Sequence, residues 1–414
     1  MLPTPQITPL ERLQVQDGLL INAERWQRSH NYHRQRQNIH YQSLHQPGVV
    51  CGLGVSLTTT PKDVPSQYDD QRWLQIKPGI AIDVVGNPII VPQPIDFHLA
   101  AEVTEAEPKL IYIVVSYVDP ETLQRKSTQE YEPETFRIDE KSTPPTPYEV
   151  ELCRILLQPG TEGLANPQNV IFPGLNCLDF RYRQIARSRP TAVFRVAHLQ
   201  DDSREAPYSY DNLCYLLQSV GNLTHHLQGE EQVDQLDFPL ADPNAAATYD
   251  LLFNTGSQPI NLSPKQSTIL KNYLDAGGVL LIESPTDAID RLESIMNLTE
   301  QWDTPLEDLR KLDRRHPMRT QPFLFAALPI INQKPVQILI AGGIVLVIGD
   351  LSLSWGLDEK LTLPRETIRT AQELGINILN YAWSRRNMTQ LLQKYVPPTT
   401  KSDVLKNVLS KLDL

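Results

Sequence analysis

Polar and apolar positions follow a helical rhythm near the start of the chain. Residues 22–44 contain no Gly or Pro, so this run can form one continuous helix until Pro47-Gly48 ends it. The residues that recur at helical spacing along one side of this helix are apolar only at its two ends and polar in the middle. Such a side does not suit burial in an apolar core. We therefore predict an exposed helix within an attachment segment of residues 1–48, bridging solvent or lying against other chains. The arginines available for polar interface contacts are Arg25, Arg28, Arg34 and Arg36.

Over residues 49–184 the pattern of polar and apolar residues becomes that of β-strands. Runs rich in β-branched residues predict an antiparallel β domain whose first strand covers residues 49–57. The sequence from Asp83 to Pro88 predicts a tight hairpin, in which Gly86 and Asn87 supply positive φ angles and the Asp83 carboxylate caps the turn. A polar, proline-bounded insertion at residues 119–147 interrupts the domain, and we predict an exposed arm or partner-facing loop there.

A third rhythm begins near Pro190. Over residues 191–384 apolar strands alternate with amphipathic helices, a pattern typical of a parallel sheet covered on both faces. Within it, Ser284-Pro285 predicts the N-cap and first residue of a helix. Residues 396–414 predict a linker and an amphipathic helix that docks on a partner subunit or on its own chain. The predicted fold class is multidomain α+β: a long helix with an antiparallel β domain, an α/β domain with a parallel sheet, and a C-terminal helix.

Composition and charge argue against several classes of function. The chain has 414 residues, a net charge of −11 and a pI near 5.4, which argues against a general nucleic-acid binder. Its start lacks an apolar signal core and no apolar run is long enough to cross a bilayer, so we expect a cytoplasmic protein without direct membrane insertion. The spacing of the cysteines matches no metal site and predicts buried free thiols at Cys51, Cys153, Cys177 and Cys214.

Polar residues gather where the predicted parallel strands end. In an open α/β sheet these ends converge on a crevice, where carboxylates can bind a divalent cation. Strand-end polar residues more commonly cap helices and hydrate loops, and we favour that interpretation here. The candidates are His198, Asp201, Asp202, Thr255, Gly256, Glu283 and Asp350.

The pattern yields no catalytic residue. An amidotransferase needs a thiolate on a sharp turn between strand and helix, with His and carboxylate partners. Ser284 has no flanking glycine to make such a turn, and Cys214 falls on the apolar face of a predicted helix. We therefore expect no catalytic group, no cofactor and no metal.

Three pieces of the N-terminal quarter carry a family resemblance. They are the helical series Trp26, Tyr32, Arg36, His40 and Leu44, the run PGVVCGLGV at residues 47–55, and the run KPGIAIDVVGNPIIVP at residues 77–92. Together they resemble a domain encoded in gene clusters for phage-tail-like contractile injection systems, although His45-Gln46 stands where His-Gly is commoner. The resemblance implies a structural part of the particle, in or near its baseplate. The candidate partner-binding residues are Arg25, Trp26, Tyr32, Arg36, His40 and Leu44.

A second resemblance covers residues 191–383 and is strongest from Tyr249 to Glu283. This stretch resembles glutamine-amidotransferase-like, flavodoxin-like domains, in particular a group that lacks the catalytic triad. It implies a flavodoxin-like α/β domain without enzymatic activity.

Two functions from different classes remain open. The preferred hypothesis is a non-enzymatic assembly protein, present in multiple copies and bound to baseplate, tube or sheath proteins of an injection particle. The alternative is an amidotransferase-like hydrolase, or a small-ligand or metal-binding enzyme, that uses the strand-end crevice. Its candidate residues are Asp201, Asp202, Glu283 and Asp350.

Overall fold

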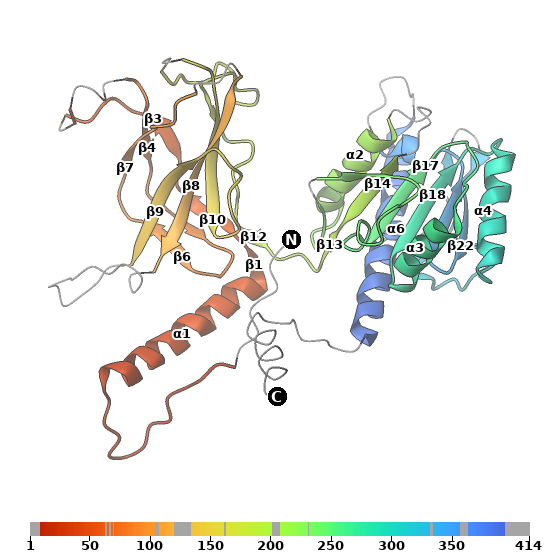
Figure 1. The fold of residues 1–414 in the computed structure, drawn as a ribbon, viewed down its shortest axis with the longest axis horizontal. Helices are drawn as coiled ribbons and strands as arrows, with labels where there is room; N and C mark the ends of the chain where they lie inside the picture. Colours follow the sequence, from red (N-terminus) through yellow and green to blue (C-terminus); the bar gives the residue numbers. More distant parts are fainter. Residues whose placement is uncertain are drawn as a thin grey trace, which may run out of the picture. The chain divides into compact units, whose positions relative to one another are not determined.

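The computed structural model describes residues 9–393, except for positions 63, 66–67, 69, 104–106, 120–133, 161–162, 201–207, 231, 332–333 and 357–362. Its contacts divide the chain into two compact units, residues 1–189 and residues 190–414 (Figure 1). The helix predicted within residues 396–414 lies outside the described part of the chain. No described helix is both long and apolar enough to cross a membrane.

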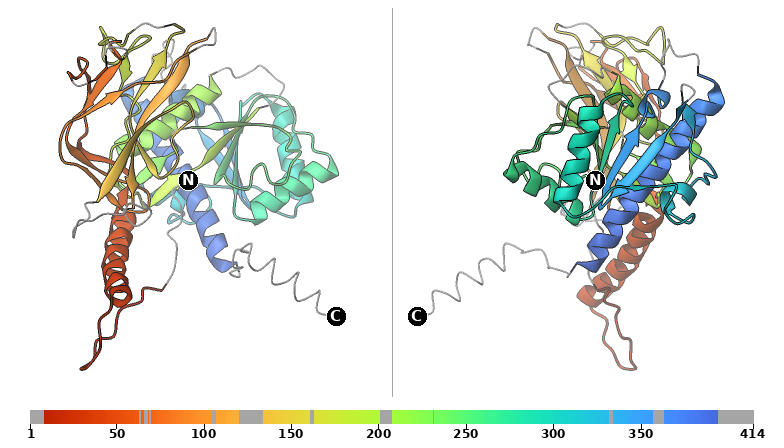
Figure 2. Two further views of the ribbon diagram at one scale, coloured as in Figure 1. Left: turned by 60° about the vertical axis from the view of Figure 1, so that its left-hand side comes forward. Right: turned by 90° about the vertical axis from the view of Figure 1, so that its right-hand side faces the viewer.

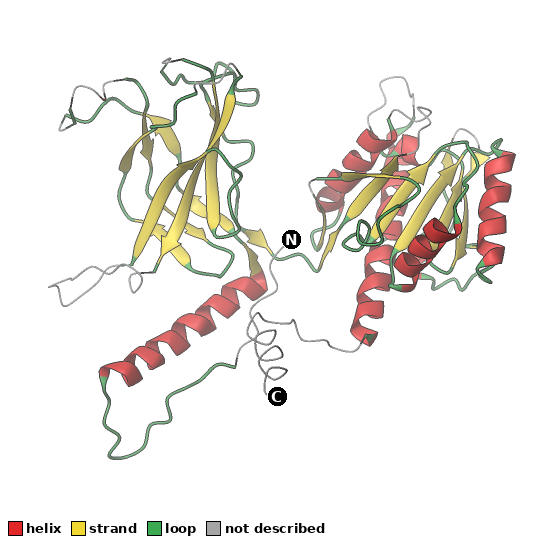
Figure 3. Ribbon diagram, viewed as in Figure 1, coloured by secondary structure: helices red, strands yellow, loops and turns green. Residues whose placement is uncertain are grey.

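The first unit carries the long helix α1, Ala23–Leu44, shown in red in Figure 3. Asn22 caps its start, because the side-chain oxygen accepts a hydrogen bond of 2.9 Å from the Arg25 backbone N–H. A helix of 22 residues is about 33 Å long. None of its residues is buried, in keeping with its polar sequence.

Antiparallel strands form the body of this unit. A four-stranded sheet has the order β11-β10-β8-β9, made of Leu178–Asp179, Glu149–Leu157, Lys109–Val118 and Thr135–Lys141. One three-stranded sheet is β2-β5-β6, made of Gly48–Gly52, Gly79–Ile82 and Pro88–Val91. The other is β3-β4-β7, made of Val55–Leu57, Trp73–Ile76 and Ile95–His98. Strands β1 (His45–Gln46) and β12 (Arg187–Ser188) pair with each other, and the three larger sheets share one apolar core.

Two predictions for this unit are wrong. Residues 49–57 belong to β2 and β3 in different sheets, because Gly52 and Leu53 have φ angles of 63° and 52° and turn the chain between them. The insertion 119–147 is not wholly an arm, since Thr135–Lys141 forms β9 and pairs with β8. Phe136 and Ile138 of β9 pack against the core. Residues 120–133 of the insertion lie outside the described residues.

The second unit is built on a seven-stranded sheet with the order β16-β14-β17-β18-β23-β22-β19. In that order the strands are Asp234–Asp237, Val196–Gln200, Leu251–Thr255, Val279–Ser284, Ile344–Ile348, Gln337–Ala341 and Glu307–Asp308. The first five pair in parallel, whereas β22 is antiparallel to both of its neighbours. The sheet is therefore mixed, because the turn at Gly342-Gly343 joins β22 to β23 as an antiparallel hairpin.

Helices cover both faces of this sheet (Figure 2). Helices α2 (Ser209–Leu223) and α6 (Arg365–Leu392) share one core with Phe253, and α3 (Pro264–Asp275) and α4 (Ile289–Gln301) share the other with Leu252. Successive strand residues point to opposite faces, so each strand supplies both cores. The smaller elements are β13 (Ala192–Phe194), β15 (Leu227–Gly229), α5 (Pro317–Thr320), β20 (Ile330–Ile331), β21 (Lys334–Pro335) and the 3-10 turn η3 (Ser352–Ser354).

Ser284 does not cap a helix, contrary to the prediction. It is the last residue of β18, where it pairs with Ile348, and its carbonyl accepts a hydrogen bond of 3.0 Å from the Gly349 N–H. Helix α4 begins only at Ile289, after the N-cap Ala288. Pairing with β23 extends the strand past the point where the local Ser-Pro signal starts a helix.

Candidate functional sites

The turn between β5 and β6 is closed by a carboxylate. Asp83 Oδ1 accepts hydrogen bonds from the backbone N–H groups of Val85 (2.9 Å) and Asn87 (2.8 Å), and the Asn87 side chain donates to Oδ2 at 2.9 Å. Burial raises the pKa of Asp83, although these bonds favour its charged form. Asp83 is thus a turn-capping residue, as predicted. Of the two residues expected to have positive φ, only Gly86 does, at 90°.

Helix α1 lies on this turn through polar side chains. The Asn38 amide nitrogen is 2.8 Å from Asn87 Oδ1, and Arg34 forms an ion pair of 3.1 Å with Asp119 at the end of β8. Gln42 adds a hydrogen bond to a carbonyl of the same turn. Arg34, Asn38 and Gln42 are four residues apart and define the inner side of α1. Arg34 therefore points to its own unit and not to a partner, contrary to the prediction.

Gly86 allows the helix to come this close to the turn. A Cβ atom at this position would lie 2.5 Å from the Asn38 carbonyl oxygen and 3.0 Å from its Cα. Such distances are below any normal contact, so a larger residue would force α1 away. In the run KPGIAIDVVGNPIIVP, Gly86 thus does more than adopt a positive φ angle. It also leaves the space in which α1 packs on the turn.

The outer side of α1 carries the predicted partner-binding residues. Arg36 and His40 each stand two residues from Asn38, which places them about 200° around the helix from it. The Arg36 guanidinium lies 5.8 Å from the centre of the Tyr32 ring. Within the set Arg25, Trp26, Tyr32, Arg36, His40 and Leu44, all are exposed except the half-buried Tyr32. The structure thus groups them away from the hairpin, and their binding to a partner stays a prediction.

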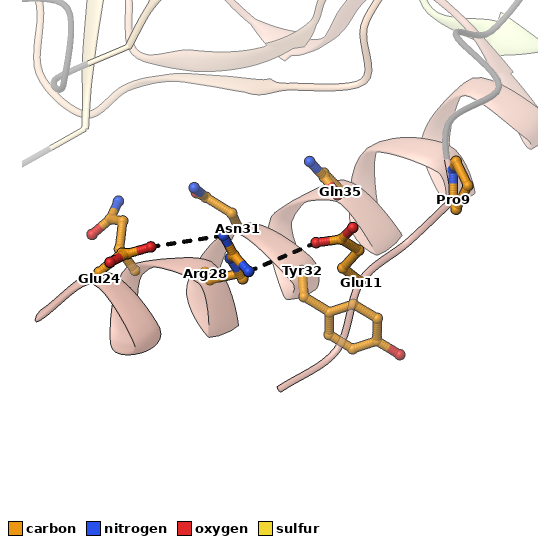
Figure 4. Close-up of a pocket in the computed structure, with 8 residues that line it drawn as sticks. Pro9, Glu11, Glu24, Arg28, Asn31, Tyr32 and Gln35 are labelled. Carbon is orange, nitrogen blue, oxygen red and sulfur yellow. Dashed lines mark ion pairs between the residues drawn. The ribbon is translucent and has the colours of Figure 1, made fainter. Parts of the chain in front are cut away.

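A polar groove follows one flank of α1 (Figure 4). It has a volume of about 490 Å³ and is lined by Pro9, Glu11, Glu24, Gln27, Arg28, Asn31, Tyr32 and Gln35. Arg28 lies between two carboxylates, 3.9 Å from Glu11 and 3.7 Å from Glu24. Both pairs are exposed, so each contributes little to stability. They leave Arg28 less available for a partner than Arg36.

Apolar side chains surround the start of α1, and this cluster was missed in the sequence. A turn at residues 16–19 joins the preceding segment to the helix, with Gly18 at a φ of 81° and Leu19 N–H bonded to the Gln16 carbonyl. Val15, Leu20 and Ile21 lie next to this turn and are 70%, 77% and 49% exposed, and Trp26 in the first turn of α1 is 57% exposed. We call these four residues the tip cluster. Its signal in the sequence is an apolar pair directly after a Gln-Asp-Gly turn.

The strand ends of the second unit place polar side chains in the interior. His198 in the middle of β14 and Glu283 next to the end of β18 are 8% and 4% exposed. His198 Nε2 is 2.8 Å from Ser209 Oγ at the start of α2, and Glu283 Oε1 accepts a hydrogen bond of 2.9 Å from the Ser352 N–H at η3. Glu283 thus bonds a backbone N–H at the start of η3, in line with the capping interpretation, whereas His198 contacts only the side chain of Ser209.

A third buried polar residue, Asn254 at the end of β17, was not among the candidates. Its Oδ1 accepts a hydrogen bond of 2.6 Å from the buried Arg291 of α4. Strand alternation directs Asn254 toward α3 and α4, whereas His198 and Glu283 point toward α2 and α6. These residues therefore do not converge on one point.

Each of the three leaves one buried polar atom without a partner in the described structure: His198 Nδ1, Asn254 Nδ2 and Glu283 Oε2. Burial lowers the pKa of His198 to about 4 and raises that of Glu283 to about 7. Burial thus favours the uncharged form of both side chains. These atoms are the part of the strand ends that can accept a ligand or a water molecule.

The other strand-end candidates do not add to a cluster. Asp201 and Asp202 lie outside the described residues, and Asp350 is half-buried just after β23. Thr255 is half-buried at the end of β17, and Gly256 follows it with a φ of 154°. Among the described residues no three His, Cys, Asp or Glu side chains are grouped to hold a metal ion.

All four cysteines are free thiols. Cys153 and Cys177 are buried as predicted, but Cys51 is exposed and Cys214 is only partly buried. Burial raises the pKa of the Cys153 and Cys214 thiols, which is opposite to the activation that a thiolate nucleophile needs.

The family comparison concerns the second unit. Residues 193–383 match a family described as a domain of unknown function (DUF4159). No curated protein matches the chain. One similar structure is the "Cytoplasmic Protein STM3548 from Salmonella typhimurium", with 12% identity over 45% of this chain and 98% of that one and a TM-score of 0.26. Another is a putative thua-like protein from Parabacteroides merdae, with 11% identity over 50% and 94% of the two chains and a TM-score of 0.25.

Proposed function

We propose that this chain is a non-enzymatic structural component of a phage-tail-like contractile injection particle, located in or near the baseplate. In this proposal it is a cytoplasmic protein, present in several copies, that binds baseplate, tube or sheath subunits. The proposal starts from the resemblance of the N-terminal quarter to a domain of such particles.

One observation supports it most: α1 is a helix of 22 residues without a single buried residue. In most globular proteins the stability of a helix comes from packing an apolar face, and α1 has none within its own unit. It is held instead by polar contacts to a turn that belongs to the same motif as the helix. A helix presented in this way has most of its surface available to other subunits.

The second unit completes the proposal as a flavodoxin-like module without catalytic machinery. Helices on both faces of a largely parallel sheet support this assignment. Burial raises the pKa of the Cys214 thiol of this unit, which does not suit a role as nucleophile. We propose that this unit contributes rigid surfaces to neighbouring subunits.

Fractionation of assembled particles tests this function. The full chain should sediment with sheath and tube proteins in a constant ratio, and deletion of residues 22–44 should release it. A control chain with Ile289→Ser and Met296→Ser, both exposed on α4, should remain bound. Circular dichroism of the deleted chain should retain the β-sheet signal. A full chain found only as a free monomer would contradict the proposal.

The strand ends of the second unit favour a second candidate, a small-ligand or metal-binding enzyme of the amidotransferase-like class. The specific observation is the unpartnered buried oxygen of Glu283, together with His198 Nδ1 on the same side of the sheet. Thermal unfolding with Mg²⁺ or Mn²⁺ tests the metal-binding form of this candidate. A metal site would raise the melting temperature, and the triple variant Asp201→Asn, Asp202→Asn, Glu283→Gln would abolish the rise. Capping residues would give no cation effect in either protein.

A further inference from the structure

We propose that the tip cluster and the outer side of α1 form one docking surface for a different protein subunit, which offers an apolar pocket with carboxylates at its rim. This inference rests on the proposed function and names the chemistry of the partner. It uses two independent features of the helix, its exposed apolar end and its distribution of charge.

The apolar end supplies the anchor. Leu20, Ile21 and Trp26 are between 49% and 77% exposed, although they are the residue types that proteins usually bury. They are held in place by the turn at residues 16–19 and by the Asn22 cap. The Trp26 ring also meets the His30 ring edge-on at 5.2 Å. A large aromatic side chain that is already ordered loses little entropy on binding, which is typical of an interface hot spot.

The charge on the outer side of α1 indicates which groups the partner presents around its apolar pocket. Arg36 faces outward with His33 and His40, and Arg25 lies on the same side, where its guanidinium donates a hydrogen bond to the Leu20 carbonyl. Helix α1 has one acidic residue, Glu24. Glu24 lies toward the groove, where it pairs with Arg28. The outer side therefore presents cationic groups without a carboxylate of its own helix beside them. Arg36 is preorganised by the Tyr32 ring, so a carboxylate on the partner can bind its guanidinium with little rearrangement.

Three other occupants fit this surface less well. A second copy of α1 would set Arg25 and Arg36 against like charges. A bilayer would have to receive Asp17, which is exposed in the turn between Val15 and Leu20. Nucleic acid would use the arginines but would leave the tip cluster without a partner, and the chain as a whole is acidic. An apolar pocket with an acidic rim on another subunit satisfies both features.

Cross-linking from the full chain in assembled particles identifies the occupant. A photoreactive phenylalanine analogue in place of Trp26 should cross-link to a particle subunit, at an apolar site with Asp or Glu nearby. The same probe in place of Lys271, exposed on α3, is the control and should not label that site. Labelling of a second copy of this chain, of nucleic acid or of lipid from position 26 would overturn the inference.

Two double variants then separate anchor from charge. Leu20→Ser with Trp26→Ala should weaken binding to the particle by about tenfold or more, the loss expected for a hot spot. Arg25→Glu with Arg36→Glu should also weaken binding to the particle. Replacing the Asp or Glu residues beside the cross-linked site of the partner with Lys should then restore it. Lys271→Glu is the matched control and should bind like the wild type. Because these changes are at exposed positions, each chain should keep its unfolding midpoint.

The outcomes distinguish the two proposals. If the wild-type chain does not sediment with a particle, the proposed function fails. If the wild type sediments and both double variants bind equally well, the function stands and the docking inference is wrong.

Discussion

Helices α1 and α6 are the two longest described in the chain, and they are held by different forces. Helix α6 has nine buried residues: Ala371, Leu374, Gly375, Ile376, Asn377, Ile378, Leu379, Ala382 and Arg386. Helix α1 has none and rests on polar contacts made by Arg34, Asn38 and Gln42. Helix α6 is part of a core, whereas α1 is an appendage fixed in one orientation. The comparison teaches that helix length says little about how a helix is held.

The largest effect should come from α6. Leu374 is completely buried between the sheet and its neighbours, so Leu374→Ala should lower the free energy of unfolding of the second unit by about 2–5 kcal/mol. The matched change Ile39→Ala in α1, where the side chain is 40% exposed, should cost below about 0.5 kcal/mol. Urea unfolding measures both. Equal losses would show that α1 is packed like α6.

Gly86→Ala should detach α1 without unfolding the β domain. The new Cβ would meet the Asn38 backbone, and the positive φ adds strain, for a combined cost of about 1–3 kcal/mol. The control is Gly160→Ala, which shares a positive φ of 110° but has no atom within 4 Å of the new Cβ. Hydrogen exchange should rise in α1 for the first variant only. Unchanged protection of α1 would mean that the turn does not seat the helix.

The buried carboxyl of Glu283 should make the second unit less stable as pH rises. Its pKa is raised from 4.5 to about 7 in the folded state, so its contribution is present at low pH and is lost as pH rises through 7. Between pH 6.5 and 8.5 the loss should be about 1 kcal/mol. Glu283→Gln should remove this slope in urea titrations at several pH values. A slope that persists in the variant would assign it to another group.

His198 should have the opposite effect at lower pH. Burial lowers its pKa from 6.5 to about 4, so its contribution is complete above pH 6.5 and is lost as pH falls toward 4. This is why the window above pH 6.5 isolates Glu283.

A comparably small effect should come from a single polar contact of α1. Gln42→Ala removes one hydrogen bond to the Val85 carbonyl and should cost about 0.5–1.5 kcal/mol, seen as faster hydrogen exchange in the last turns of the helix. Gln37→Ala, at an exposed position of the same helix, is the control. If both variants exchange alike, the contact to the turn contributes nothing.

Local patterns predicted the elements whose signals do not depend on distant strands. The helix at residues 22–44 and the turn capped by Asp83 both follow from their own residues. Ser284 shows the limit, because pairing with β23 overrides a good helix-start signal. In β9 the alternating Phe136 and Ile138 were a usable signal, hidden by the charged residues beside them, Arg137 and Asp139.

The candidate sites divide in the same way. The polar stripe of α1 predicted that its outer residues are exposed. It did not predict that Arg34 points inward, because the partner of Arg34, Asp119, is 85 residues away in the sequence. The partner of Glu283, at Ser352, is equally remote in sequence. Such contacts depend on tertiary structure, and only the fold reveals them.

The seating of α1 on a β-turn has a mechanical consequence. Any pull on the far end of the helix reaches the framework at two places, the turn at Gly86 and the pairing of β1 with β12. The first passes the load into strands β5 and β6, and the second passes it to Arg187–Ser188, just before the chain enters its second unit. A rod anchored in this way acts as a lever, so tension at its tip is transmitted as torque and is not absorbed by a loose tether.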